Sequence, residues 1–277
     1  MPEQPRTTPD APLSPPELLA VALEAAQAAA AVIRDFTPRL RNIVWQEKGA
    51  TDFVSEVDLT AEQRILEVVR RHVPHAGFLA EETASTMSPD TQQSGVVFVI
   101  DPLDGTTNFL HGYPEYAVSI GVLVEGVLTA GVVLDVPSNE CFTATAGGGA
   151  ALNGESIHVS TIDNPQRALF ATGFPFVRHE EIAPYLEQLG RVMAGASGVR
   201  RAGAAALDLA SVACGRFDGF WEMRLSPWDM AAGTLLVREA GGVVTTIEGD
   251  ECPVARTSVL AGSAAMHSWL LRTVNNA

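Results

Sequence analysis

Cysteine is scarce in this sequence: three residues among 277, far apart at Cys141, Cys214 and Cys252. An odd number of cysteines without C-x-x-C spacing argues against a disulfide framework or a cysteine zinc site. This usage predicts a reducing, cytoplasmic setting. The N-terminus is polar and proline-rich rather than basic and then apolar, so we expect no signal peptide.

Basic charge and long apolar runs are also in short supply. The 18 Lys and Arg residues against 33 Asp and Glu residues give a net charge of −15, which argues against direct nucleic-acid binding. A phosphorylated substrate is not excluded, because bound metal ions can supply local positive charge. No uninterrupted run of 18 apolar residues occurs, so we expect no membrane-spanning segment.

The proline and helix signals suggest how the chain is divided. Residues 1–13 hold four prolines among polar residues and are predicted to be a disordered tail. Ser14-Pro15-Pro16-Glu17 is typical of a helix start, and an alanine-rich helix is expected to about Phe36. Strand and helix patterns then alternate, which predicts an α/β fold. A hairpin is expected at Glu125-Gly126, and further helices are expected over about 56–73, 180–194 and 227–240. We expect one domain over 14–277, with an α+β half to about 160 and an α/β half from about 161.

The stretch from Val96 to Phe109 is the most informative part of the chain. Val96–Ile100 is apolar and β-branched, which predicts a strand buried on both faces. We expect Pro102 to end this strand, which places Asp101 and Asp104 at the sheet edge where open α/β sheets bind ligands. The next residues are predicted to open a short helix or turn with free N–H groups facing the same point. Carboxylates beside free amides suit a hard cation shared with a phosphate, although Asp-Pro-Leu-Asp-Gly is also a common kind of turn.

Further acids end predicted strands or begin predicted helices. Glu81 follows the strand from Gly77, with Glu82 beside it, and solvated surface is the other interpretation of this pair. Glu222 ends a strand and Asp229 begins a helix. For Asp58, in the first turn of a predicted helix, complementing the helix dipole and binding a metal remain open alternatives. Together these acids predict a carboxylate-lined Mg²⁺ site that faces a phosphate.

Two motifs about 125 residues apart carry a family resemblance. Asp101-Pro-Leu-Asp-Gly-Thr-Thr-Asn-Phe109 and Trp228-Asp-Met-Ala-Ala-Gly233 resemble the two signatures of the inositol monophosphatase family. The resemblance runs from about Leu18 to the C-terminus. It implies an alternating αβαβα sandwich of the inositol monophosphatase and fructose-1,6-bisphosphatase type, usually a homodimer. It also implies a phosphatase domain that hydrolyses small phosphomonoesters with two or three Mg²⁺ ions and is inhibited by Li⁺.

The resemblance implies a role for each matching residue. One metal would be held by Glu81, Asp101 and the Leu103 carbonyl, and a second by Asp101, Asp104 and Asp229, which makes Asp104 central to catalysis. Glu81 with Asp58 would bind a weaker third ion. Thr106 and Glu81 would orient the attacking water, and the amides of Gly105 and Thr106 would hold the phosphate. The alcohol part of the substrate would contact Gly203, Ala204, Ala205, Glu222 and Asp229.

The Thr106-Thr107-Asn108 run resembles the branch that acts on inositol 1-phosphate. Fructose 1,6-bisphosphate, histidinol phosphate and adenosine 3′,5′-bisphosphate remain alternatives, as does another phosphorylated polyol or sugar. Arg200 and Arg201 are interpreted either as contacts to a second phosphate or as partners of acids at a subunit interface. An aspartyl-phosphate mechanism is excluded, because Pro102 stands where its nucleophilic Asp should be. Some bacterial relatives act on the transcription machinery, so an interaction protein is the alternative to an enzyme.

Overall fold

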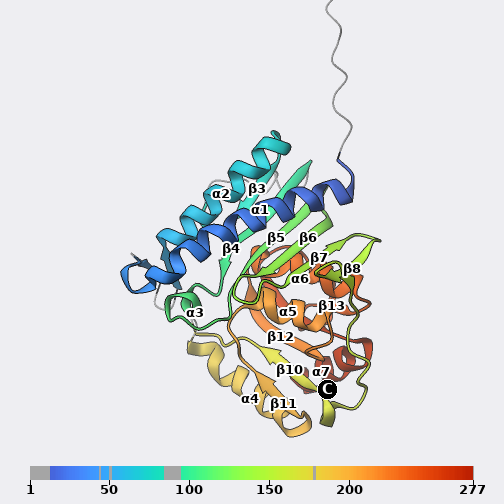
Figure 1. Ribbon diagram of the computed structural model, residues 1–277. Helices are drawn as coiled ribbons and strands as arrows, with labels where there is room; N and C mark the ends of the chain where they lie inside the picture. The colour runs from blue at the N-terminus through green and yellow to red at the C-terminus, as the bar shows by residue number, and fades with distance from the viewer. Residues whose placement is uncertain (1–12, 44, 50–51, 84–94, 177–178, 277) are drawn as a thin grey trace, which may run out of the picture.

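The computed structural model describes residues 13–43, 45–49, 52–83, 95–176 and 179–276. All but one residue of the predicted proline-rich tail lies outside these ranges, so its disorder stays a prediction. The described residues form a layered sandwich in which two β-sheets alternate with pairs of helices (Figure 1). The expectation of alternating α and β layers is confirmed.

The larger sheet lies in the N-terminal half of the chain and has seven strands in the order β3-β4-β5-β6-β7-β8-β9. β3 and β4 are parallel, and the strands that follow pair antiparallel. The bounds are β3 Gly77–Ala80, β4 Val96–Asp104, β5 Ala117–Val124, β6 Val127–Asp135, β7 Cys141–Thr145, β8 Gly149–Leu152 and β9 Glu155–Ser156. The expected hairpin at Glu125-Gly126 joins β5 to β6, and both turn residues have positive φ, as this tight turn requires.

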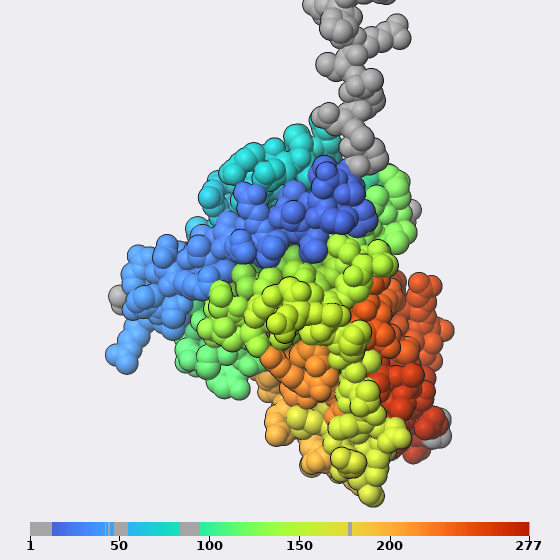
Figure 2. Space-filling model, turned by 45° about the vertical axis from the view of Figure 1, so that its right-hand side comes forward, coloured from blue at the N-terminus to red at the C-terminus, as the bar shows by residue number. Residues whose placement is uncertain are grey.

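The smaller sheet has five strands in the order β11-β10-β12-β14-β13. Its strands are β10 Leu169–Thr172, β11 Gly198–Arg200, β12 Gly219–Leu225, β13 Val243–Thr245 and β14 Thr257–Gly262. Residues before about 160 make the upper part of the molecule in Figure 2, and the later residues make the lower part. A hairpin of β1 Trp45–Gly49 and β2 Asp52–Ser55 stands apart from both sheets.

Three pairs of helices complete the layers. α1 (Pro15–Phe36) and α2 (Glu56–His72) pack on the outer face of the larger sheet, α5 (Ala205–Ala213) and α6 (Pro227–Glu239) lie between the sheets, and α7 (Ala264–Asn275) with α4 (His179–Gly195) covers the smaller sheet (Figure 1). The short pieces are α3 Thr106–Leu110 and the 3₁₀ turns Thr37–Asn42 and Pro165–Arg167. Most of these helices start or end within a residue or two of the predicted positions.

Helix α1 begins as the sequence predicts, with a capping box in which the Ser14 N–H donates to Glu17 Oε2 at 2.8 Å. Together with the 3₁₀ turn after it, the segment Pro15–Arg41 is long and apolar enough on average to cross a membrane, by length and composition alone. Its apolar face, from Leu18 to Ile33, is buried, and α1 packs against α2 and β6. The alanines on this face therefore belong to the core of the domain, where they let the neighbouring elements approach closely.

The prediction that Pro102 ends its strand is wrong. β4 continues to Asp104, with Asp101 opposite Ser119 and Asp104 opposite Ala117 across a shift in register. Pro102 is tolerated because it lies within this bulge, where a ladder hydrogen bond is already missing. Likewise Glu222 does not end its strand, because β12 runs on to Leu225 through another irregularity.

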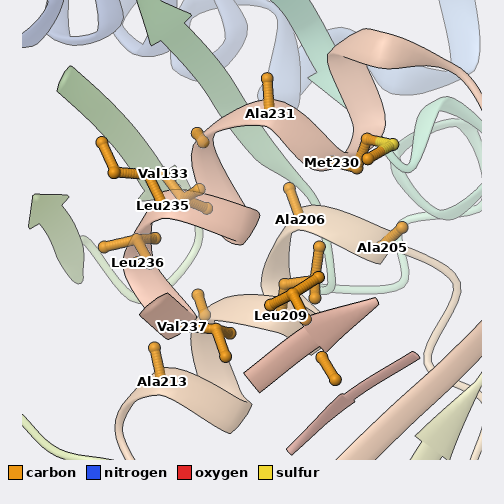
Figure 3. Packing of buried hydrophobic residues seen from close by; sticks show 14 of the residues in the cluster. Val133, Ala205, Ala206, Leu209, Ala213, Met230, Ala231, Leu235, Leu236 and Val237 are labelled. Carbon is orange, nitrogen blue, oxygen red and sulfur yellow. The ribbon is translucent and has the colours of Figure 1, made fainter. Parts of the chain in front are cut away.

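Helix α6, which carries Asp229, is held close to the sheet and to α5 by glycines. A Cβ added to Gly121 on β5 would lie 2.7 Å from the Ala231 Cβ, and one added to Gly233 would lie 2.5 Å from the Leu209 Cβ. Figure 3 shows the side chains of α5 and α6, Leu209 and Ala231 among them, packed in this middle layer. Gly233 in the second motif therefore has a packing role.

Replacing Gly121 by Ala is expected to lower the free energy of unfolding by about 1–3 kcal/mol, since the added methyl group overpacks the contact with α6. The α6 atoms nearest to the added methyl group include backbone atoms of Ala231 and Ala232, which cannot rotate away. Chemical denaturation measures the change. The matched control is Gly190→Ala on α4, which has open space around it and is expected to lose no stability. Equal stability of the two variants would contradict this packing account.

Candidate active site

A pocket of about 420 Å³ opens where the ends of β3 and β4 meet α3, the segment before α5, and the first turn of α6. It brings together residues that are far apart in the sequence. The lining residues are Glu81, Asp101, Leu103, Asp104, Gly105, Thr106, Thr107, Asn108, Phe176, Arg201, Gly203 and Asp229. Every predicted metal ligand except Asp58 is among them, as are both predicted phosphate contacts.

The β4 bulge places two of the carboxylates. Asp101 and Asp104 are buried, and both accept backbone hydrogen bonds. The Leu103 N–H donates to Asp101 Oδ1 at 3.0 Å, and the Ala206 N–H donates to Asp104 Oδ2 at 2.7 Å. Asp104 therefore connects the end of β4 to the start of α5, although the two lie about a hundred residues apart in the chain.

The ends of β3 and α6 supply the other two carboxylates. The Glu81 N–H still bonds the Ile100 carbonyl of the parallel strand β4, so the Glu81 side chain leaves the sheet beside Asp101. Asp229 accepts from the Ser226 N–H at 2.7 Å in the capping box that starts α6. Glu82 is not among the lining residues, so the two neighbouring acids differ, and the surface interpretation does not describe Glu81.

Asp58 lies behind the pocket rather than in its lining. Its Oδ2 accepts from the Ser55 N–H at 2.8 Å, closing the capping box of α2, and its Oδ1 accepts from the Thr106 hydroxyl at 2.8 Å. Asp58 therefore caps the start of α2 by direct hydrogen bonds, and its effect on the helix dipole stays a prediction. The contact with Thr106 was not expected from the sequence, and the metal-ligand role of Asp58 stays a prediction.

Gly105 is required by the turn between β4 and α3. Its φ is +93°, and a Cβ there would lie 2.8 Å from the Glu115 carbonyl oxygen. Any larger residue would be strained and would push the chain away from the pocket. The Asn108 side chain holds the same turn from the other side, since its Nδ2 donates to the Glu115 and Ala202 carbonyls at 2.7 and 3.0 Å.

The carboxylates raise one another's pKa values. Burial raises the pKa of Asp101 well above its usual range, and the nearby Glu81, Asp104 and Asp229 raise it further. Burial also raises the pKa of Asp104 to about 7, although the Ala206 N–H opposes the shift. The pocket therefore concentrates negative charge that only a cation, or bound protons, can neutralise.

The donor set fits Mg²⁺ in its chemistry. Mg²⁺ prefers carboxylate and carbonyl oxygens, and Glu81, Asp101, Asp104, Asp229 and the Leu103 carbonyl are of that kind. Within the described ranges, no three His, Cys, Asp or Glu side chains are already assembled around one metal position. The carboxylates of Asp101, Asp104 and Asp229 bond backbone N–H groups instead. The carboxylates therefore lie in one pocket but are not arranged around a single ion position.

A smaller cavity of about 160 Å³ adjoins the pocket and shares Asp104, Arg201, Gly203 and Asp229 with it. Ala205 and Glu222, both predicted to contact the alcohol part of the substrate, line this cavity. The pKa of Glu222 is raised to about 8, by burial first and by the nearby Asp229 second, while Arg201 opposes the shift. Ala204, the remaining predicted contact, is buried at the N-cap of α5 and lines neither cavity.

Arg201 in the pocket and Glu62 behind the turn after β3 have contacts that the sequence did not predict. Arg201 is the one cationic side chain among the described lining residues, and its guanidinium lies 5.4 and 5.2 Å from the ring centroids of Phe174 and Phe176. Glu62 on α2 is buried and accepts from the Glu82 N–H at 2.8 Å, which fixes the turn after β3. Only the Arg200-Arg201 pair gave a signal in the sequence, and Arg200 does not line the pocket.

The fold and the acidic pocket point to one class of protein. Residues 14–277 match the family model described as the inositol monophosphatase family, so the chain belongs to this family and the resemblance of its motifs is confirmed. Membership supports a phosphomonoesterase with a phosphorylated small-molecule substrate.

Particular relatives carry two kinds of name. The chain is 44% identical over 259 residues to the Nus factor SuhB of Pseudomonas aeruginosa, covering 93% of this chain and 95% of that protein. It is 42% identical over 258 residues to the inositol-1-monophosphatase of Mesorhizobium japonicum, covering 93% and 96%. The crystal structure of the extragenic suppressor protein suhB from Bartonella henselae superposes with a TM-score of 0.87 at 41% identity, covering 93% and 98%.

Proposed function

We propose that this protein is a Mg²⁺-dependent phosphatase that hydrolyses inositol 1-phosphate to inositol and phosphate by direct attack of water. The observation that carries the proposal is the convergence of Glu81, Asp101, Asp104 and Asp229, from three separate segments, on one pocket beside Gly105 and Thr106. The name of the Mesorhizobium japonicum relative supports the choice of substrate.

Different residues of the site would bind the metal ions, the phosphate and the alcohol part of the substrate. Glu81, Asp101, Asp104, Asp229 and the Leu103 carbonyl would hold two ions, and Glu81 with Asp58 a weaker third. When bound, Mg²⁺ neutralises the phosphate charge, lowers the pKa of water and stabilises the leaving alkoxide. The amides of Gly105 and Thr106 would bind the phosphate oxygens, while Gly203, Ala205, Glu222 and Asp229 would contact the alcohol.

The hydrogen bonds of Thr106 support its role in orienting water. A hydroxyl group has one proton, and two oxygens can accept it from Thr106: Asp58 Oδ1 at 2.8 Å and the Leu103 carbonyl at 3.1 Å, of which Asp58 is the nearer. The Thr106 oxygen then has lone pairs left to accept a hydrogen bond from water. Glu81, at the end of the neighbouring parallel strand β3, would accept a second hydrogen bond from that water. Asp58 is thus proposed as the positioning residue that fixes the direction of the Thr106 hydroxyl.

Two other functions have some support. Arg201 at the pocket wall is placed to meet a second anionic group, which favours a bisphosphate as the alternative substrate. The name Nus factor SuhB, carried by a relative 44% identical, favours a transcription-associated interaction as a second role. We also propose a homodimer, from the resemblance, and a reducing cytoplasmic setting, which the three free cysteines support.

The test is phosphate release from a panel of esters with Mg²⁺, each with and without Li⁺. The panel contains inositol 1-phosphate, glycerol 2-phosphate, fructose 1,6-bisphosphate, histidinol phosphate and adenosine 3′,5′-bisphosphate. The expected result is the highest kcat/KM for inositol 1-phosphate, with inhibition by Li⁺. Preference for a bisphosphate would overturn the substrate but keep the reaction class. No release from any ester would favour the interaction role.

A further inference from the structure

Asp208 is a buried carboxyl group, and the structure shows no partner for one of its two oxygens. It lies in the first turn of α5, the helix whose start binds Asp104, and its exposed fraction is 1%. Its Oδ1 has no hydrogen-bond partner within the part of the chain that the structure describes. Leaving a buried polar oxygen unsatisfied destabilises the folded state, so folded proteins rarely contain one without a reason.

The surroundings of Asp208 suggest what its partner is. Asp208 lines the 160 Å³ cavity beside the main pocket, together with Thr172, Glu222 and Arg201. Gly173 also lines it, and a Cβ at that position would overlap the Glu222 carboxyl group. The wall of the cavity is therefore mostly polar, and the absence of a side chain at Gly173 leaves room for the Glu222 carboxyl group. Leu225 and Ala205 are the apolar residues of the wall. A small molecule rich in hydrogen-bonding groups suits such a cavity, while an apolar one does not.

The charges around the cavity favour a neutral occupant. Burial raises the pKa of Asp208 well above its ordinary value, and the carboxylates of Glu222, Asp104 and Glu115 raise it further, while Arg201 opposes them. A neutral carboxyl group both donates and accepts hydrogen bonds. An alcohol hydroxyl does the same, so the two groups are complementary.

We propose that Asp208 is a specificity-determining residue whose carboxyl group hydrogen-bonds a hydroxyl group on the alcohol part of the substrate. The inference rests on the proposed phosphatase function and names the feature of the substrate that the side cavity recognises. The substrate is then a phosphate ester of a polyhydroxylated alcohol, with one hydroxyl reaching past Glu222 to Asp208. Esters without such a hydroxyl are hydrolysed at the same centre but leave Asp208 unpaired.

The test compares inositol 1-phosphate with p-nitrophenyl phosphate, whose alcohol part has no further hydroxyl. Asp208→Leu has the same branched shape without hydrogen-bonding atoms, and Asp208→Asn keeps a donor and an acceptor. In Asp208→Leu, the ratio of kcat/KM for inositol 1-phosphate to that for p-nitrophenyl phosphate is expected to fall about tenfold, the effect of one lost hydrogen bond. Asp208→Asn is expected to restore most of this ratio.

Equal loss on both esters, or no loss on either, would overturn the role of Asp208 while leaving the phosphatase function intact. If the wild-type protein hydrolyses neither ester, the proposed function fails and this inference fails with it. Thermal denaturation confirms that each variant is folded. The failure of the Asp208 role and the failure of the proposed function are distinguishable, because hydrolysis of p-nitrophenyl phosphate depends on the carboxylate pocket alone.

The pH dependence of stability provides a second readout. Asp208 ionises near pH 4 in the unfolded chain but keeps its proton to a much higher pH when folded. The unfolded state therefore binds fewer protons above pH 4, and stability falls as pH rises through that window. Asp208→Asn removes this contribution, so its Tm relative to wild type is expected to be higher at pH 7 than at pH 3.5. A difference in Tm that does not change with pH would contradict the burial of a protonated carboxyl group.

Discussion

Replacing Asp104 by Asn is expected to give a folded protein that has lost at least ~100-fold in kcat. The Asn side-chain oxygen can still accept the hydrogen bond that the Ala206 N–H donates to Asp104 Oδ2, so the link between β4 and α5 survives. What is lost is one negative charge at the centre of the carboxylate pocket. A Lewis-acid metal contributes several kcal/mol to such reactions, and ~100-fold corresponds to about 2.7 kcal/mol. Phosphate release at saturating Mg²⁺ measures the change.

The control for this variant is Asp163→Asn, which removes a carboxylate from an exposed loop and is expected to keep wild-type kcat. Asp229→Asn should resemble Asp104→Asn, because Asp229 lines the same pocket and its bond to the Ser226 N–H can be kept. Asp104→Asn with wild-type turnover in Mg²⁺ would show that the carboxylate cluster is not the catalytic centre. Unfolding of Asp104→Asn would instead show that its link to α5 depends on the charge.

Glu81→Gln is expected to lower kcat by about 10²-fold and to change KM little. The carboxylate is proposed to orient the attacking water, together with Thr106, by accepting a hydrogen bond from it, and a neutral amide accepts this bond less strongly. Because the effect falls on the chemical step, single-turnover measurements should show the same loss as the steady state.

Glu82→Gln is the matched control, since the neighbouring acid is not among the residues that line the pocket. It is expected to keep kcat. Similar losses in both variants would indicate that the turn after β3 is disturbed, and an unchanged kcat in Glu81→Gln would count against its role in orienting water.

The sequence predicted elements well where the signal was local. The capping box at Ser14, the hairpin turn at Glu125-Gly126 and the apolar strand before Asp101 each depend on neighbouring residues, and the structure has them where expected. Pro102 misled the prediction because its tolerance depends on a bulge against Ser119 and Ala117, which lie on another strand. Local rules do not include the partner strand.

The residues of the site follow the same rule: those with a local sequence signal were predicted, and those whose place depends on packing were not. Asp101, Asp104 and Asp229 were found because each lies in a motif at the end of a strand or start of a helix. Asp208 and Glu62 gave no signal, because a single acid in a helical pattern is normally exposed, and their burial follows only from how the layers pack. For Asp58 the sequence left two interpretations open, and the structure added the contact with Thr106 across 48 residues of chain.

The most direct test of the central claim is phosphate release from inositol 1-phosphate by the wild-type protein, first after divalent ions have been removed and then after Mg²⁺ is added back. The account predicts no turnover without divalent ions and full recovery with Mg²⁺, because the pocket concentrates carboxylates that must be neutralised before a phosphate can enter. Steady release without divalent ions, or none with them, would contradict the assignment of this pocket as a Mg²⁺-dependent phosphatase centre.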